Sequence, residues 1–145
     1  MNNENLHKEI DLIQNCINRM AGNSFLLKGW AISIIAVVLA LAENRANPLF
    51  LLCTVFIPLF CFWYLDSFFL QTEKMYRKLY DWVLVQRKNG NEEYQYNLNP
   101  HRFKNEVESL CCVMFSTTLR VYYGIPMLIV LIIILYQSHK LYCFK

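Results

Sequence analysis

The chain has 145 residues, of which 56% are hydrophobic and 17% are charged, and its formal net charge is +3. This length leaves room for one compact unit, and an average soluble domain carries roughly 25% charged residues. The composition therefore excludes the ordinary soluble class and favours an all-α integral membrane protein. Aromatic residues make up 15% of the chain, and tyrosine and tryptophan gather at membrane interfaces.

Residues 3–21 are predicted to form an amphipathic helix. Charged residues, Glu9 among them, are expected on its polar faces, and the spacing of the apolar residues alternates between four and three, as in a heptad seam. The seam consists of Leu6, Ile10, Ile13, Ile17 and Met20. It is too short for an independent coiled coil, so we expect it to pack against another part of the chain or a neighbouring subunit. The tripeptide Gly22-Asn23-Ser24 is expected to loosen or end the helix.

Two apolar segments follow and are predicted to cross a membrane. Residues 25–42 are apolar apart from Lys28 and one serine, and 18 residues reach about 27 Å, close to the thickness of a bilayer core. The second span covers 48–70, with a kink expected at Pro58. Because the turn at 43–47 is short, the two spans must form an antiparallel hairpin.

The segment 71–120 is predicted to be a helical cytoplasmic insertion. Its first helix continues from the second span and should end near the breaker Lys88-Asn89-Gly90-Asn91. A second helix is predicted from Asn99 as N-cap and Pro100 at the first helical position, lying on the membrane surface or against residues 71–88. One face of this helix carries Phe103, Val107, Leu110, Cys111, Met114 and Phe115.

The third span is predicted over about 121–136. Gly124 and Pro126 are expected to mark a bend at its start, and the stretch that follows is dense in leucine, isoleucine and valine. A short mixed tail, 137–145, completes the chain.

The distribution of lysine and arginine predicts the orientation. Eight of the 14 lie in residues 71–120, three in the N-terminal arm through Lys28, one in the turn and two in the tail. The positive-inside rule then places the N-terminus and the middle segment in the cytoplasm and the turn and the C-terminus outside, as in a multi-pass protein of the inner-membrane type. A signal-peptidase site at Ala40-Leu41-Ala42 is disfavoured, because a long polar segment containing acids precedes the apolar stretch.

No catalytic or metal-binding pattern is found in the sequence. The six cysteines form no CxxC pair and have no histidine at a ligand spacing, so we expect no metal and no other cofactor. At least five are interpreted as packing residues in a reducing compartment, and Cys143 is left open. Without a nucleophile beside a base, paired carboxylates or a glycine-rich phosphate loop, an enzyme is not expected.

Lys28 and Asp66 are the two charges placed closest to the hydrocarbon. They lie 18 and 20 residues from Ala46 at the hairpin tip, so an antiparallel hairpin brings them to nearly the same depth. We expect an ion pair, either structural or acting as a gate, since ionisable residues in membrane segments are functional candidates. The alternative is that Lys28 snorkels to the headgroups while Asp66 ends the span.

Basic residues of the middle segment can serve two purposes. They can bind anionic lipid headgroups as part of the topology signal, or they can hold a phosphate-rich ligand such as an oligonucleotide. The candidates for the second role are Lys74, Arg77, Lys78, Arg102 and Lys104.

Hydroxyl groups precede the third span and are candidates for the mouth of a pore. The four candidates are Ser116, Thr117, Thr118 and the nearby Arg120. A cluster of hydroxyls can line a water path or bond back to its own helix. The third span has no polar stripe, so a pore lined by it would gate by dewetting.

Two segments carry a family resemblance. RMAGNSFLLKGW and WYLDSFFLQTEKMYRKLYD resemble, over the layout of residues 10–85, small membrane proteins of bacterial anti-phage defence systems, above all the membrane effector of the Hailong system. The resemblance implies an oligomeric ion channel, a tetramer, encoded beside a nucleotidyltransferase. An oligodeoxyadenylate made by that enzyme would keep the channel closed, and loss of the inhibitor would depolarise the membrane and arrest growth.

Three functional classes therefore remain. The first is a channel or pore effector. The second is a membrane anchor or accessory subunit that regulates a cytoplasmic partner without conducting ions. A small transporter is disfavoured, because no charge or unwound segment is predicted at the membrane midplane.

Overall fold

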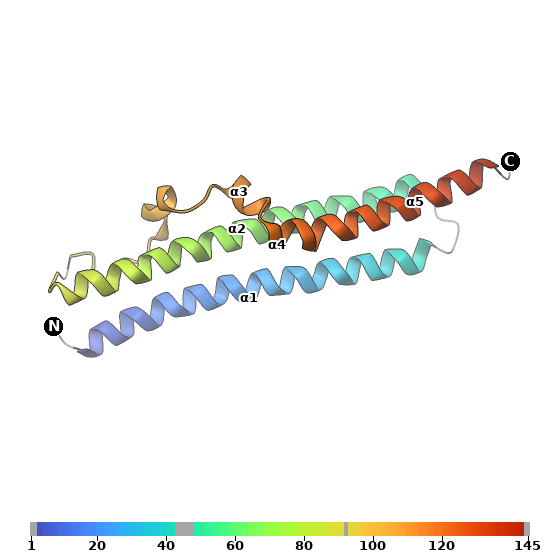
Figure 1. Cartoon of the computed structure of the whole chain (residues 1–145). Helices are drawn as coiled ribbons and strands as arrows, with labels where there is room; N and C mark the ends of the chain where they lie inside the picture. Colours follow the sequence, from blue (N-terminus) through green and yellow to red (C-terminus); the bar gives the residue numbers. More distant parts are fainter. Residues whose placement is uncertain (1–2, 43–47, 92, 144–145) are drawn as a thin grey trace. The chain divides into compact units, whose positions relative to one another are not determined.

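The structure is a computed structural model that describes residues 3–42, 48–91 and 93–143. These residues form helices and connecting turns, with no strand among them. The helices are α1 (Asn3–Ala42), α2 (Pro48–Lys88), the 3₁₀-helix η1 (Pro100–Glu106), α3 (Leu110–Met114), α4 (Thr117–Leu119), the π-helix η2 (Arg120–Gly124) and α5 (Ile125–Cys143) (Figure 1). The all-helical fold class is confirmed. The turn predicted at 43–47 lies outside the described residues.

Three helical stretches are long and apolar enough to cross a membrane. They are Glu4–Ala40, Leu52–Lys88 and Thr117–Tyr136. Each contains one of the three predicted spans or most of it, so the prediction of three apolar helices of sufficient length is confirmed.

The chain packs into two compact units. Unit 1 contains the chain up to Ser24 together with Ser67–Val113, and unit 2 contains Phe25–Asp66 and the chain from Met114 onward. Both α1 and α2 therefore contribute one part to each unit.

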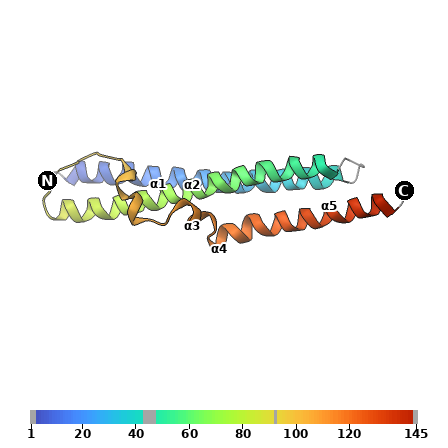
Figure 2. The ribbon, with the colours of Figure 1, turned by 90° about the horizontal axis from the view of Figure 1, so that it is seen from above.

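Unit 1 is built on the first part of α1 and the last part of α2, which run side by side in both views (Figures 1 and 2). The predicted seam of α1 packs here against another part of the chain: Ile13 is fully buried with Leu79 and Val83 of α2. Phe103 of η1 completes this core. Burial of these four side chains, at about 1.5–3 kcal/mol each, holds η1 against the helix pair.

Unit 2 has a narrow core and a wide apolar surface. Val55, Leu59, Leu119 and Tyr123 are almost fully buried, yet many large apolar side chains face outward. The most exposed, each more than 60% accessible, are Phe25, Trp30, Phe50, Ile57, Ile132 and Tyr136. Soluble monomers do not present apolar surface on this scale, so this surface calls for lipid or for another protein.

The predicted helix break at Gly22-Asn23-Ser24 is wrong, since α1 is continuous. A helical glycine costs only about 1 kcal/mol relative to alanine. Ser24 is buried and so is Met20 one turn earlier, and this packing outweighs the weak local preference.

The end of α2 agrees with the prediction. The helix runs through Pro58 and stops at Lys88, where Gly90 adopts a φ of 75°. The N–H of Asn89 donates to the carbonyl of Val85 at 3.1 Å, which satisfies one carbonyl of the last turn.

The single helix predicted after Asn99 is wrong in length, although its N-cap is correct. The Asn99 side chain accepts from the N–H of His101, but the 3₁₀-helix ends at Glu106 and Val107 is extended. The carbonyl of Glu108 accepts from the side chain of Gln71 at 2.9 Å. In a regular helix this carbonyl would accept a backbone N–H instead. A new short helix then starts after Ser109, whose hydroxyl accepts from Cys112.

The third apolar helix differs from the prediction at both ends. Helical structure begins at Thr117, passes through a π-helical turn at Arg120–Gly124 and continues to Cys143, so the predicted tail is helical as far as that residue. Pro126 has no N–H to donate to the carbonyl of Tyr122, and loss of that α-helical bond favours a wide turn at the place where a bend was expected.

Candidate functional site

Lys28 and Asp66 meet inside unit 2. The Lys28 ammonium lies 2.6 Å from Oδ2 of Asp66, and the side chains are 21% and 0% exposed respectively. The contact expected from their similar distances to the hairpin tip is therefore present. A fully buried carboxylate with its cation at the edge of an apolar unit is a costly arrangement that requires close pairing.

Two tyrosines from the π-helical turn complete the site, and sequence reasoning missed both. The Tyr123 hydroxyl donates to the same Asp66 oxygen at 3.1 Å. The Tyr122 hydroxyl donates to the backbone carbonyl of Lys28 at 3.1 Å, and the Lys28 ammonium lies 5.9 Å from the centre of the Tyr122 ring. The sequence feature that could have indicated their role is the occurrence of two adjacent tyrosines at the start of an otherwise apolar span.

Trp63 fixes the orientation of Tyr123. Its indole ring stacks on the Tyr123 ring with centres 6.1 Å apart and planes 12° from parallel. Its Nε1–H donates to the carbonyl of Met114 at 2.8 Å. The phenol that bonds Asp66 is thus held by stacking on one face, which favours a single geometry for the ion pair.

Three of the predicted ligand-binding residues line one shallow hollow of about 300 Å³ in unit 1, together with three carboxylates. The lysine and arginine residues are Lys74, Arg77 and Lys78, and the acids are Asp81, Glu106 and Glu108. Lys74 is paired with Glu108, and Arg77 with Glu73 at 2.7 Å. Because the charges around the hollow cancel, it is poorly suited to a polyanion.

Arg102 and Lys104 lie on η1 and are not among the residues that line this hollow. The Arg102 guanidinium covers the Trp82 ring at 4.0 Å from its centre and approaches Tyr94 at 5.0 Å. Arg102 is nevertheless exposed, so it presents a stacked cation at the surface of unit 1.

The four pore-mouth candidates lie at consecutive helix junctions of unit 2. Ser116 is the N-cap of α4 without a side-chain capping bond, and Arg120 begins η2. Thr117, Thr118 and Arg120 are exposed. Ser116 directly precedes the third apolar stretch, and the other three lie within its first residues. Their role as a pore mouth stays a prediction.

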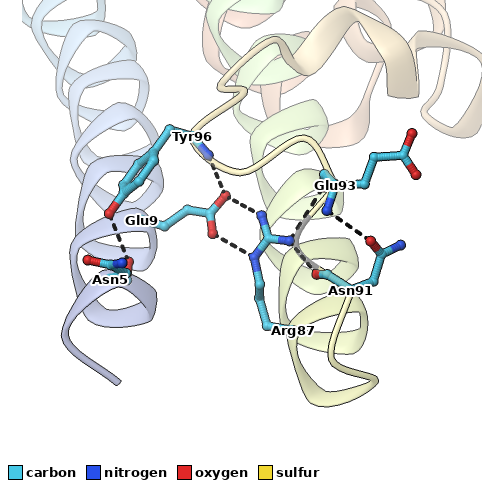
Figure 3. A network of polar contacts seen from close by, with 6 residues as sticks. All are labelled: Asn5, Glu9, Arg87, Asn91, Glu93 and Tyr96. Carbon is cyan, nitrogen blue, oxygen red and sulfur yellow. Dashed lines mark hydrogen bonds and ion pairs between the residues drawn. The ribbon is translucent and has the colours of Figure 1, made fainter. Parts of the chain in front are cut away.

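A second ion pair, unforeseen from the sequence, lies in unit 1 (Figure 3). Arg87 makes two parallel bonds to Glu9, Nε to Oε2 and Nη2 to Oε1, both at 2.9 Å, and each side chain is 1% exposed. Glu9, expected on a polar face of α1, therefore faces the interior. Glu9 lies one turn before Ile13, at the edge of the apolar seam, and this position was the only feature of the sequence that indicated its burial.

The loop after α2 closes over this pair. Nη1 of Arg87 donates to the carbonyl of Asn91, and the N–H of Tyr96 donates to Oε1 of Glu9 at 2.9 Å. Tyr94 and Tyr96 both have φ near 60°, a region that costs a non-glycine residue about 1 kcal/mol or more. The bond to Glu9 holds Tyr96 in this conformation.

The described cysteines Cys16, Cys53, Cys61, Cys111 and Cys112 are free thiols, and the Cys143 side chain lies outside the described part. Within the described residues no three His, Cys, Asp or Glu side chains come together as a metal site.

No known protein family, curated protein or solved structure matches the chain.

Proposed function

We propose that the chain is a three-span protein of a bacterial inner membrane, with its N-terminus and the segment between the second and third spans in the cytoplasm. The outward-facing aromatic and aliphatic side chains of unit 2 support this, because such a surface is stable in lipid and not in water. The concentration of lysine and arginine in residues 71–120 supports the orientation.

We further propose that copies of the chain assemble into an ion-conducting pore that acts as an effector of anti-phage defence. The observation that carries this is the Lys28–Asp66 pair, a buried carboxylate held by a cation and a phenol within an apolar unit. Charged residues in membrane segments are expensive and mark ion paths or gates. Movement of the turn that carries Tyr123 would release one partner of Asp66 and change the charge presented to ions.

The proposed defence role rests on the sequence resemblance, which also implies a regulator of the pore. A tetramer restrained by an oligodeoxyadenylate from a neighbouring nucleotidyltransferase is the form that the resemblance implies. The exposed Arg102, with Lys104 on the same 3₁₀-helix, supports contact with such a polyanion better than the charge-balanced hollow at Lys74 does. Anionic lipids would bind the remaining basic residues.

Expression of the chain alone, with a voltage-sensitive dye as reporter, tests the pore. We expect depolarisation and growth arrest. Asp66→Asn, which removes the buried charge without changing the volume, should alter the depolarisation. Asp81→Asn is the matched control, because Asp81 is an exposed acid on the same helix. Normal membrane potential at equal membrane levels of the chain would reject the pore.

The second candidate is a membrane anchor or accessory subunit, and the construction of unit 1 favours it. The buried Arg87–Glu9 pair fixes the loop that follows α2, and the exposed Arg102 stacks on Trp82. Arginine and aromatic side chains are enriched where proteins bind one another. An anchor should be tolerated on expression alone, whereas an unrestrained pore should be toxic.

A further inference from the structure

An apolar groove of about 340 Å³ opens on unit 2 beside the Lys28–Asp66 pair. One wall is α1, through Ala31, Ile32 and Ile35, and Leu59 of α2 contributes to the lining. The other wall is the π-helical turn with the start of α5, from Val121 to Pro126. Nearly all of the lining atoms are apolar, so the groove offers an occupant hydrocarbon contact and no hydrogen bonds.

One end of the groove is polar. Lys28 lies three, four and seven residues before Ala31, Ile32 and Ile35, so it shares their face of α1. The Tyr122 hydroxyl bonds the Lys28 carbonyl, which places the turn of Arg120 at the level of Lys28. Arg120 is exposed, and no carboxylate among the described residues pairs with it.

The lining of the groove and the cation beside it select the occupant. A hydrocarbon chain matches the apolar lining, and an anionic headgroup matches Arg120. A cation at one end and hydrocarbon beyond it together describe an amphiphile with an anionic head.

We propose that the groove binds one acyl chain of an anionic membrane phospholipid, with the headgroup phosphate at Arg120. This rests on the proposed membrane insertion. The tail contacts Tyr122 and Tyr123, whose hydroxyls bond Lys28 and Asp66, so lipid occupancy stabilises the turn that holds the ion pair. Lipid binding at this site would therefore favour the intact Lys28–Asp66 pair over the separated one.

Native mass spectrometry of the full chain in detergent, titrated with phosphatidylglycerol or phosphatidylcholine, tests the site. Wild-type chain should retain one phosphatidylglycerol per subunit in preference to phosphatidylcholine. Ile35→Trp, which fills the groove, should weaken this binding roughly tenfold through lost hydrocarbon contact. Val37→Trp is the matched control, because Val37 is 59% exposed on the same helix and lies outside the groove.

A second variant separates the headgroup from the tail. Arg120→Gln should abolish the preference for phosphatidylglycerol while phosphatidylcholine binding is unchanged, and it leaves the groove lining intact. Equal lipid retention by Ile35→Trp and Val37→Trp would overturn the proposal. So would a change of subunit number in Ile35→Trp with unchanged lipid retention, because a side chain of a second copy would then occupy the groove.

Carbonate extraction of membranes from cells that express the chain separates membrane insertion from lipid binding. A wild-type chain that carbonate releases from the membrane would overturn both membrane insertion and the lipid site. A chain that stays embedded but shows no lipid binding dependent on Ile35 would overturn the lipid site alone.

Discussion

Unit 1 and unit 2 each hold one ion pair with a buried carboxylate, and the two pairs are built differently. In unit 1 both partners are 1% exposed, Arg87 bonds Glu9 through two N–H groups, and backbone groups of the following loop take further bonds. In unit 2 the Asp66 carboxylate is fully buried, but Lys28 is 21% exposed and lies beside an apolar groove.

The difference separates a fixed contact from a releasable one. A bidentate arginine pair has a defined geometry and loses much energy when one partner leaves. A lysine ammonium is a point charge on a flexible stem that can exchange its carboxylate for water or a headgroup. We infer that the pair in unit 1 sets a structure and that the pair in unit 2 can switch.

The largest loss of stability is expected when the fixed pair of Glu9 and Arg87 is removed. Arg87→Ala should lower the free energy of unfolding by about 3–5 kcal/mol, because Glu9 would stay buried without its cation. Thermal unfolding in detergent, followed by circular dichroism, measures this. Lys8→Ala is the control, since Lys8 and Glu4 form an ion pair whose two side chains are both exposed, and such pairs contribute about 1 kcal/mol or less. Equal losses in the two variants would contradict the distinction.

The second effect is the coupling between Lys28 and Asp66. In a double-mutant cycle with Lys28→Met and Asp66→Asn, the two stability changes should be non-additive by about 1–3 kcal/mol, because the side chains touch. Thermal unfolding of the three variants and the wild type gives the coupling energy. Additive changes would show that the contact contributes no energy.

The third effect concerns the phenol that supports Asp66. Tyr123→Phe should destabilise the chain by about 1–2 kcal/mol, because it removes a hydrogen bond to a buried charged group. Tyr122→Phe removes a bond to a backbone carbonyl and should cost less, about 0.5–1 kcal/mol. Thermal unfolding of both variants gives their shifts in melting temperature, and the shift should be larger for Tyr123→Phe. A larger shift for Tyr122→Phe would show that Tyr122, and not Tyr123, is the main support of the ion pair.

The smallest effect is expected at the surface of unit 1. Arg102→Gln should cost about 0.5–1 kcal/mol through the lost contact with Trp82 and should change the indole fluorescence of the chain. Lys104→Gln, on the same 3₁₀-helix, should leave both unchanged. A fluorescence change in both variants would show that the stacked cation is not the cause.

Sequence patterns predicted the features that depend on periodicity or on short-range chemistry. Within the predicted seam, Ile13 and Met20 are buried and the other three residues are partly buried. The helix α2 ends at the glycine-containing breaker. The Lys28–Asp66 contact was predictable because a hairpin fixes depth by counting residues from its tip.

Features that depend on tertiary contacts were not predictable from periodicity. Glu9 and Arg87 are 78 residues apart in sequence, and no local pattern pairs them. The helix expected after Asn99 ends at Glu106, and the extended segment that follows is bonded to another helix, where Gln71 donates to the carbonyl of Glu108. Tyr123, which bonds Asp66, lies in a π-helical turn, and a regular helical projection does not place such a residue correctly.

The π-helical turn at Arg120–Gly124 also decides where the third apolar helix tolerates a change of length. A π-turn holds one residue more than an α-turn, so deletion of one residue within it would restore regular winding and leave the later side chains on nearly the same face. Val130 and Ile134, now buried, would then stay on the packed face. Each α-helical residue advances the chain by about 100° around the axis, so the same deletion in the regular helix after Pro126 would rotate both residues away from that face.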